Sequence, residues 1–353
     1  MTRLFRHLLI VLGLCLSAVS GGAAMGQEPV VTIAPPQGPS SGEALPEDTE
    51  EPAPPPRCGT QPMTIGRMQW PSAAILAEIH ARILAAQFDC EVRVQQVDQV
   101  AAGSSMGTTG QPAIAPELWL GRIADVWNAG VKAQKLRQAG ATYDQQVFEG
   151  WYVPDYVVET IPEATTIEGL RQRWTDFAGE GGGRARFLSC PPDWACAVIN
   201  RNLLRAHGLD AYFEVVEPAN RFELDTLIAE AVGRREPLLF YYWAPNAVLA
   251  QFSFRPVDLG GFNREGYACL GRSACPGPQA SGFPNEPVVI ALAEWVYLEA
   301  TPVASYFQRA RMPMAEMNAL LQLLGEPGQT VETVAERFVA DKGDIWRAWV
   351  GTP

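Results

Sequence analysis

The sequence has little basic charge, few histidines and no long hydrophobic segment. Its 353 residues include 27 lysines and arginines against 39 aspartates and glutamates, for a formal net charge of −12. This balance argues against nucleic-acid binding and against attraction to an anionic membrane surface, because both depend on clustered cationic side chains. No apolar run reaches the roughly 18–20 residues of a membrane span. The sequence has three histidines and no paired carboxylate motif, so few side chains are available to act as general acid or base in catalysis.

The N-terminal segment predicts export. Arg3 and Arg6 precede an apolar run over residues 8–19 and then small residues, which is the order of a secretory signal peptide covering residues 1–26. Cys15 follows Leu14 inside the apolar run, a context that does not favour a lipoprotein cleavage site. Residues 27–57 are rich in proline, glycine and serine and predict a disordered tether. We therefore expect a periplasmic protein whose folded part begins near Cys58.

Six cysteines remain once residues 1–26 are removed, and an even number in an exported chain favours three disulfides. They are Cys58, Cys90, Cys190, Cys196, Cys269 and Cys275. Two pairs are local by spacing, since five residues separate 190 from 196 and 269 from 275, which leaves 58 to pair with 90. Free buried thiols are the alternative. A zinc site is disfavoured because no C-x2-C pair is present.

The mature chain alternates strand-like and helix-like segments. We expect strands at 63–68, 92–97, 113–118, 147–158, 184–188, 213–216 and 238–243, and helices at 72–88, 123–138, 197–207, 222–235, 305–310, 314–324 and 331–340. This order predicts an α/β protein with mainly parallel sheets.

One short motif points to a serine hydrolase. Residues 103–107 read Gly-Ser-Ser-Met-Gly, matching the G-x-S-x-G nucleophile elbow, which needs a strand before the serine and a helix after it. The glycine and proline that follow predict a loop instead, and His207 is the only later candidate base. A secreted hydrolase using Ser105 is therefore kept as an alternative function.

Four tryptophans share an unusual local setting. Trp70, Trp119, Trp194 and Trp243 stand at or just after the carboxyl end of an expected strand, or in a loop that leads into a helix. Open α/β sheets bind ligands at this edge, so the four side chains are candidates for one pocket. Several aromatic faces together suit a quaternary ammonium group through cation–π attraction. The alternative is four unrelated core or surface tryptophans.

Three segments near these tryptophans resemble a known family. They are Glu149–Val158 (EGWYVPDYVV), Cys190–Cys196 (CPPDWAC) and Tyr241–Pro245 (YYWAP). In this order they are similar to the glycine betaine/choline-type substrate-binding proteins of ABC importers, the OpuAC-like family, and the resemblance extends from about Cys58 to Trp349. It implies a two-lobed periplasmic-binding-protein fold with a central ligand cleft and C-terminal helices.

The same resemblance implies a function. The protein would be non-enzymatic, would need no cofactor or metal, and would bind a small quaternary ammonium solute such as glycine betaine or choline. Its partners would be the membrane permease and ATPase of an ABC importer. A solute-binding module that serves a sensor fits the same sequence and stays open.

Individual site residues follow from the resemblance. Trp119, Trp194 and Trp243 would form the aromatic box, Trp70 matches a position used in some members, and Trp151 or Tyr152 would add a further wall.

The chain departs from the family where Ala113 replaces an aspartate of many relatives and Ser72 replaces an acidic residue of some. Ile123 stands where some betaine binders have a carboxylate-contacting histidine. We expect a ligand carboxylate to dock on free N–H groups at a helix start, near Cys196 and Ala197. Arg122 could take the place of that histidine, but as an isolated arginine it is expected to be a solvated surface charge.

The resemblance also divides the chain into lobes joined by two crossing strands. The first lobe is expected to comprise residues 58–153 and 253–353, and the second residues 154–252.

Overall fold

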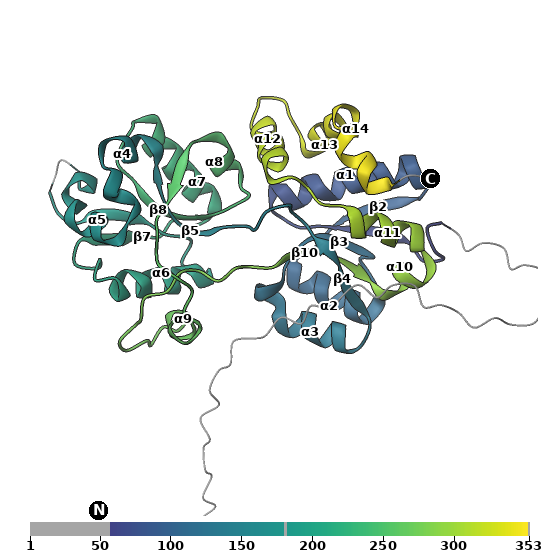
Figure 1. Ribbon diagram of the computed structural model, residues 1–353, viewed down its shortest axis with the longest axis horizontal. Coiled ribbons are helices and arrows are strands. Elements are labelled where there is room, and N and C mark those ends of the chain that lie inside the picture. The colour runs from purple at the N-terminus through teal and green to yellow at the C-terminus, as the bar shows by residue number, and fades with distance from the viewer. Residues whose placement is uncertain (1–56, 180–181, 352–353) are drawn as a thin grey trace, which may run out of the picture.

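The computed structural model describes residues 57–179 and 182–351, which form two lobes, each built on a five-stranded sheet flanked by helices (Figure 1). The expected signal peptide and nearly all of the expected tether lie outside these residues. Within the described ranges, no helix is both long and apolar enough to cross a membrane.

The first lobe contains a mixed sheet with the strand order β2-β1-β3-β10-β4. Its elements are β1 (Met63–Arg67), α1 (Pro71–Phe88), β2 (Val92–Gln96), α2 (Gln99–Thr109), β3 (Ile114–Trp119), η1 (Leu120–Ile123), α3 (Ala124–Lys132), β4 (Leu136–Ala141) and β10 (Val288–Ala293). β1 is parallel to β2 and β3, whereas β10 runs antiparallel to β3 and β4.

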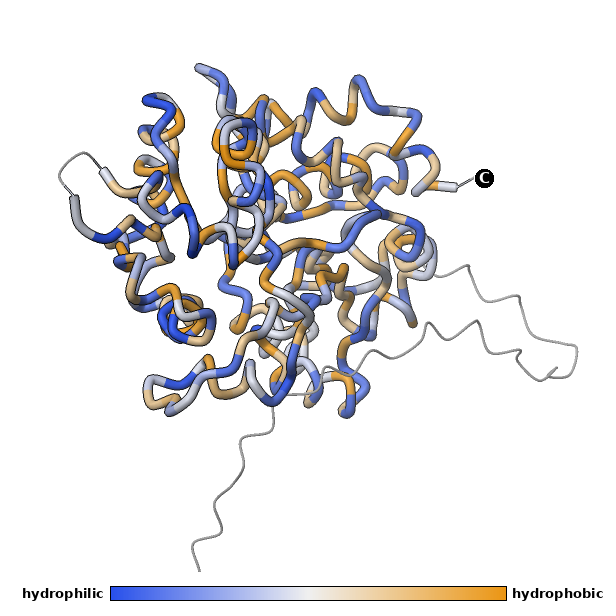
Figure 2. Tube along the Cα trace, turned by 60° about the vertical axis from the view of Figure 1, so that its left-hand side comes forward, coloured by the Kyte–Doolittle hydropathy of each residue, from blue (hydrophilic) through white to orange (hydrophobic). Residues whose placement is uncertain are grey.

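C-terminal helices complete the first lobe. They are α10 (Glu294–Glu299), α11 (Thr301–Arg309), α12 (Met314–Leu324), α13 (Val331–Asp341) and α14 (Gly343–Val350). Among the helix pairs, α1 and α13 share the most extensive contact. The apolar residues Ile75, Ile79 and Ile83 of α1 are fully buried. Along the helices, hydrophobic and hydrophilic residues alternate in short stretches, as amphipathic packing requires (Figure 2).

The second lobe contains a sheet with the strand order β7-β6-β8-β5-β9. Its elements are β5 (Glu149–Pro154), α4 (Asp155–Thr160), η2 (Pro162–Thr165), α5 (Ile167–Gln172), η3 (Trp174–Phe177), β6 (Ala185–Leu188), α6 (Ala195–Ala206), β7 (Phe213–Val216), α7 (Arg221–Gly233), β8 (Leu239–Trp243), α8 (Ala247–Gln251), β9 (Phe254–Pro256) and α9 (Arg264–Leu270). β6 is parallel to β7 and β8, and β5 is antiparallel to β8 and β9.

Strand pairing moves the expected lobe boundaries. β5 and β9 belong to the second sheet, so the expected boundary between residues 153 and 154 falls inside β5, and residues 254–270 belong to the second lobe. The chain leaves the first lobe after Asp144, whose N–H donates to Met312, and enters the second at Phe148, whose carbonyl accepts from Ala244. It returns before Pro287, whose carbonyl accepts from Leu120.

Two expected elements end early. The helix expected over 123–138 stops at Lys132, because Gln134 adopts a left-handed conformation with φ 53° and the chain then forms β4. The strand expected over 147–158 stops at Pro154 and continues as α4.

The three expected disulfides are present. Cys58–Cys90 joins the start of the described chain to the residues just after α1, Cys190–Cys196 spans the loop that leads into α6, and Cys269–Cys275 joins the last turn of α9 to the loop that follows it. Each of the last two therefore holds a short loop of the second lobe.

Candidate functional site

Two of the predicted box tryptophans lie at one end of the first sheet. Trp119 is the last residue of β3, and Trp70 immediately precedes α1, which begins with Pro71. Pro71 suits the first helical position because its missing N–H needs no partner there. Both indoles therefore lie where the chain leaves the sheet, the edge at which α/β folds place ligands.

A buried glutamate holds both indoles. Glu117 is fully buried, and its Oε1 accepts hydrogen bonds from Trp70 Nε1 at 2.7 Å, Trp119 Nε1 at 3.0 Å and Ser72 Oγ at 3.2 Å. Its Oε2 accepts from the Tyr143 hydroxyl at 2.7 Å. Burial raises the pKa of Glu117, while these four hydrogen bonds oppose that rise. The arrangement fixes the orientation of Trp70 and Trp119 through their N–H groups.

Sequence reasoning missed Glu117 and Tyr143. The available signal was a charged residue inside the otherwise apolar strand Ile114–Trp119, two residues before a box tryptophan. Nothing in the spacing indicated that Tyr143, on the segment after β4, would reach the same carboxylate.

Arg122 is an exposed residue, as expected of a surface charge, but it also contacts a partner in each lobe. Although its side chain is 46% exposed, its guanidinium lies 4.9 Å from the ring centre of Trp119 and 3.6 Å from Glu149 Oε2 of β5. Glu149 also accepts a hydrogen bond from the Tyr241 hydroxyl. Arg122 thus links the first lobe to the second beside a box tryptophan.

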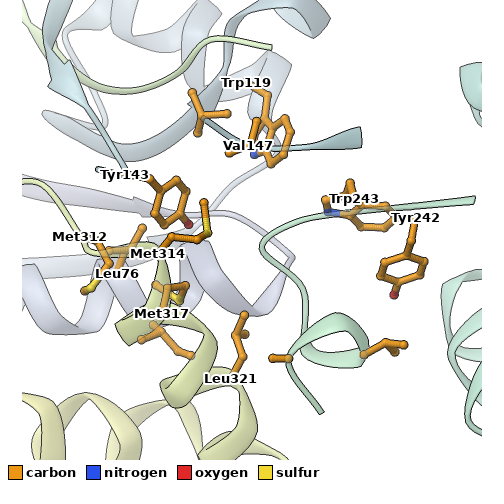
Figure 3. Packing of buried hydrophobic residues seen from close by; sticks show 14 of the residues in the cluster. Leu76, Trp119, Tyr143, Val147, Tyr242, Trp243, Met312, Met314, Met317 and Leu321 are labelled. Atoms are coloured by element: carbon orange, nitrogen blue, oxygen red, sulfur yellow. The ribbon is translucent and has the colours of Figure 1, made fainter. Parts of the chain in front are cut away.

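The second lobe contributes Trp194 and Trp243. Trp243 ends β8 and pairs in register with Glu149, so its side chain lies on the same face of the sheet as the carboxylate that binds Arg122. The ring centres of Trp194 and Trp243 are 5.6 Å apart at an interplanar angle of 58°. Trp243 also stacks on Tyr242 at 4.6 Å. Figure 3 shows Trp119 and Tyr143 from the first lobe together with Trp243 and Tyr242 from the second.

The loop closed by the Cys190–Cys196 disulfide contains Trp194, which lies just before α6. Trp194 precedes the helix and supplies no side-chain cap to it. Its carbonyl accepts the Ala197 N–H at 3.1 Å, so that donor is not free as expected, and Cys196 and Ala197 are both buried. Of the residues at this helix start, Ala195 is the exposed one.

Trp151 is a core residue and not a wall of the pocket. It is fully buried, its Nε1 donates to Asn200 Oδ1 at 2.9 Å, and its ring lies 4.7 Å from that of Phe187. Tyr152 points to the opposite face of β5, because successive strand residues alternate, and its ring packs with those of Phe148 and Phe240. Both side chains contribute to the packing of the second lobe.

Two cavities lie beside the interlobe crossings. One of about 250 Å³ is lined by residues 147–149, 256–260 and 282–285, and one of about 330 Å³ by residues 143–147 and 286–289 among others. The predicted box tryptophans line neither of these two cavities.

The G-x-S-x-G motif serves helix packing. Its residues lie inside α2, where a Cβ at Gly103 would come within 3.3 Å of the Ile123 and Val126 side chains, and Gly107 approaches Gly130 of α3. The loop expected after the motif is the end of this helix. A nucleophile elbow instead needs the serine on a turn between strand and helix.

The remaining hydrolase and metal hypotheses also lack support. His207 belongs to the second lobe, where its ring contacts Trp151 and burial lowers its pKa to about 4, whereas Ser105 belongs to the first. In the part of the chain that the structure describes, no group of three or more His, Cys, Asp or Glu residues is arranged to hold a metal ion.

Comparison with known proteins identifies relatives of this architecture. Residues 61–341 match the OpuAC family, described as the substrate-binding domain of ABC-type glycine betaine transport systems. Among solved structures, lactococcal OpuAC in its closed conformation with glycine betaine has a TM-score of 0.58 at 14% identity, over 82% of this chain and 100% of that one.

Two further structures are similar to the same extent. The glycine/betaine/L-proline-binding protein ProX from Borrelia burgdorferi has a TM-score of 0.56 at 14% identity, over 82% of this chain and 96% of its own. An ABC-transporter choline-binding protein in complex with choline has a TM-score of 0.56 at 14% identity, over 83% of this chain and 92% of its own. At this identity the structural likeness shows the fold.

Proposed function

Because the chain belongs to the OpuAC family of substrate-binding domains of ABC-type glycine betaine transport systems, we propose that it captures a quaternary ammonium solute between its two lobes. Proteins of this family bind solutes and are not enzymes. In our proposal, Trp119 and Trp70 receive the methylated cation on the first lobe, and Trp194 and Trp243 close over it from the second.

The observation that carries the proposal is the way the indoles are held. Trp70 and Trp119 donate their N–H groups to Glu117, so a ligand would meet ring faces and no free indole N–H. Trp119 is 2% exposed in this structure and Arg122 lies over its ring, so a ligand reaches that ring by displacing Arg122. A trimethylammonium group suits ring faces because it offers no hydrogen-bond donor, and each ring contributes roughly 0.5–2 kcal/mol of cation–π attraction.

The charges beside the tryptophans favour a cation. The carboxylate of Glu117 bonds to two of the tryptophans, and Glu149 and Glu286 lie beside Arg122 and its neighbour Gly121. A nearby excess of negative charge attracts a cationic solute and adds to the contribution of the ring faces. For a zwitterion such as glycine betaine, the exposed start of α6 at Ala195 supplies backbone N–H groups for the carboxylate.

Closure is a hinge movement about the two chain crossings. The crossing segments, near residues 145–147 and 283–286, have no strand or helix of their own. A rotation about them brings Trp243 towards Trp119 without disturbing either sheet. The loaded protein then delivers the solute in the periplasm to the membrane permease and ATPase of an importer.

Calorimetric titration of residues 57–351 against glycine betaine, choline, carnitine and proline betaine tests this function. Trp243→Ala should bind the preferred solute roughly ten- to a hundredfold more weakly, which corresponds to about 1.4–2.8 kcal/mol, and Trp243→Phe should lose less. Because Trp243 is 7% exposed without ligand, melting temperatures are needed to confirm that each variant is folded.

Trp174→Ala is the matched control. Trp174 is a partly buried tryptophan of the same lobe that packs on Tyr212 at 5.8 Å, and its loss should leave affinity unchanged. Failure of the parent protein to bind any methylated cation, or unchanged affinity in folded Trp243→Ala, contradicts the proposal.

A further inference from the structure

Glu117 is a buried carboxylate whose hydrogen-bond partners are all neutral. The four donors are two indole N–H groups, from Trp70 and Trp119, and two hydroxyls, from Ser72 and Tyr143. Indole N–H groups can only donate, so Oε1 accepts from both, which the charged carboxylate and the acid protonated at Oε2 both allow. Among the described ion pairs, none supplies Glu117 with a cation.

An uncompensated buried charge is costly unless a cation approaches it. The Glu117 oxygen Oε1 is bonded to the N–H groups of Trp70 and Trp119, the two rings that would contact the proposed ligand. The indole N–H groups lie 2.7 and 3.0 Å from Oε1, and a cation stacks within about 6 Å of a ring centre, so the two charges would be separated by roughly 6 Å or more across the indole. Such a cation favours the charged form of Glu117, and the charged form favours the cation.

We propose that Glu117 is the fixed counter-charge of the bound cation and the positioning residue for Trp70 and Trp119, which makes the site select a charged trimethyl group over an uncharged group of the same shape. This inference rests on the proposed function and adds the source of its charge selectivity. The carboxylate acts through the indoles and does not touch the solute. The ligand therefore leaves without breaking a direct ion pair.

The geometry also provides a suitable isosteric variant. In Glu117→Gln, the amide oxygen placed at Oε1 still accepts from Trp70, Trp119 and Ser72. The amide NH2 then donates to the Tyr143 hydroxyl, which can reverse its role and accept. The substitution removes the charge and keeps every contact, so a folded variant is expected.

The experiment compares methylated cations with an uncharged carbon analogue. Calorimetric titration measures choline and glycine betaine against 3,3-dimethyl-1-butanol, the analogue of choline in which carbon replaces the quaternary nitrogen. Glu117→Gln should weaken binding of the preferred cation roughly ten- to a hundredfold, as expected for one charge at about 6 Å and an effective dielectric constant of about 20. Affinity for the neutral analogue should change less than about threefold.

Two further variants sharpen the result. Glu117→Asp keeps the charge but shortens the reach, so affinity should fall for both ligands while the preference for the cation remains. Glu316→Gln is the matched control, because Glu316 is a largely buried carboxylate of the first lobe (13% exposed) whose partner is Lys342 and not a tryptophan. Its removal should leave both affinities unchanged.

The outcomes are distinguishable. If the parent binds neither cation, the proposed function fails and the inference fails with it. If the parent prefers the cation and folded Glu117→Gln keeps that preference, or loses both ligands equally, the inference is overturned while the function stands. If Glu117→Gln does not fold, Glu117→Asp decides, because a folded Asp variant without charge preference contradicts the inference.

Discussion

Replacing Arg122 with alanine is expected to tighten the binding of choline. In this structure the guanidinium lies 4.9 Å from the Trp119 ring centre and 3.6 Å from Glu149, so a cation of the protein itself occupies one side of a box residue. A choline molecule that takes this ring face must displace Arg122. Removing Arg122 removes that cost and leaves Glu149 without its cation.

The magnitude follows from the two contacts that are given up. A partly exposed cation–π contact contributes roughly 0.5–1 kcal/mol and an exposed ion pair about 0.2–1 kcal/mol. Together they correspond to roughly 3- to 30-fold in the dissociation constant. Choline is the right probe because it has no carboxylate that Arg122 could attract. The same contacts contribute to the fold, so the melting temperature should fall slightly while affinity rises.

Arg137→Ala is the matched control. Arg137 also stacks on an aromatic ring, that of Tyr297 at 3.7 Å, and pairs with Glu294 at 3.0 Å, but it lies towards the opposite end of the first sheet from Trp119. Its loss should lower stability and leave choline affinity unchanged. Unchanged or weaker choline binding by folded Arg122→Ala refutes the displacement argument.

Two more expectations concern the loop closed by Cys190–Cys196 and the buried imidazole of His80. Replacing Cys190 and Cys196 with serine should weaken solute binding about two- to tenfold by calorimetry, because the tryptophan between them must be ordered on binding, whereas serines at Cys269 and Cys275 should not. Burial lowers the pKa of His80 to about 3. Urea titrations should therefore show the full free energy of unfolding above about pH 6.5 and a loss of up to roughly 1.4 kcal/mol per pH unit as the pH falls from there towards 3. The variant His80→Asn should show a smaller loss.

The features that were predictable are those with strong local signals. The spacing of apolar residues predicted the start of α1 to within one residue. The proline or cysteine near Trp70 and Trp194 indicated that these two residues lie outside the apolar stripe of a helix. The short cysteine spacings identified two disulfides without knowledge of the fold. In each case the evidence lies within a few residues of the feature.

What was missed depends on partners distant in sequence. The role of Glu117 needs Ser72 and Tyr143, which come from other elements and meet only after the first sheet has formed. Trp151 and Tyr152 alternate on β5, and the faces that they occupy depend on how β5 pairs with β8. α2 contains two glycines and two threonines, so its helix depends on packing against α3 rather than on propensity.

The route of the chain makes the second lobe an insertion between two neighbouring strands. Residue Ala141 of β4 pairs with Val289 of β10, and the Thr142 N–H donates to the Val288 carbonyl at 3.1 Å. The inserted segment therefore leaves and rejoins the first sheet about one strand spacing, roughly 4.8 Å, apart. A short hairpin turn joining these strands would close the first lobe by itself, and another second lobe would fit the same two ends. Glu117 and Trp243 therefore stand on two parts of the chain that only these two crossings connect.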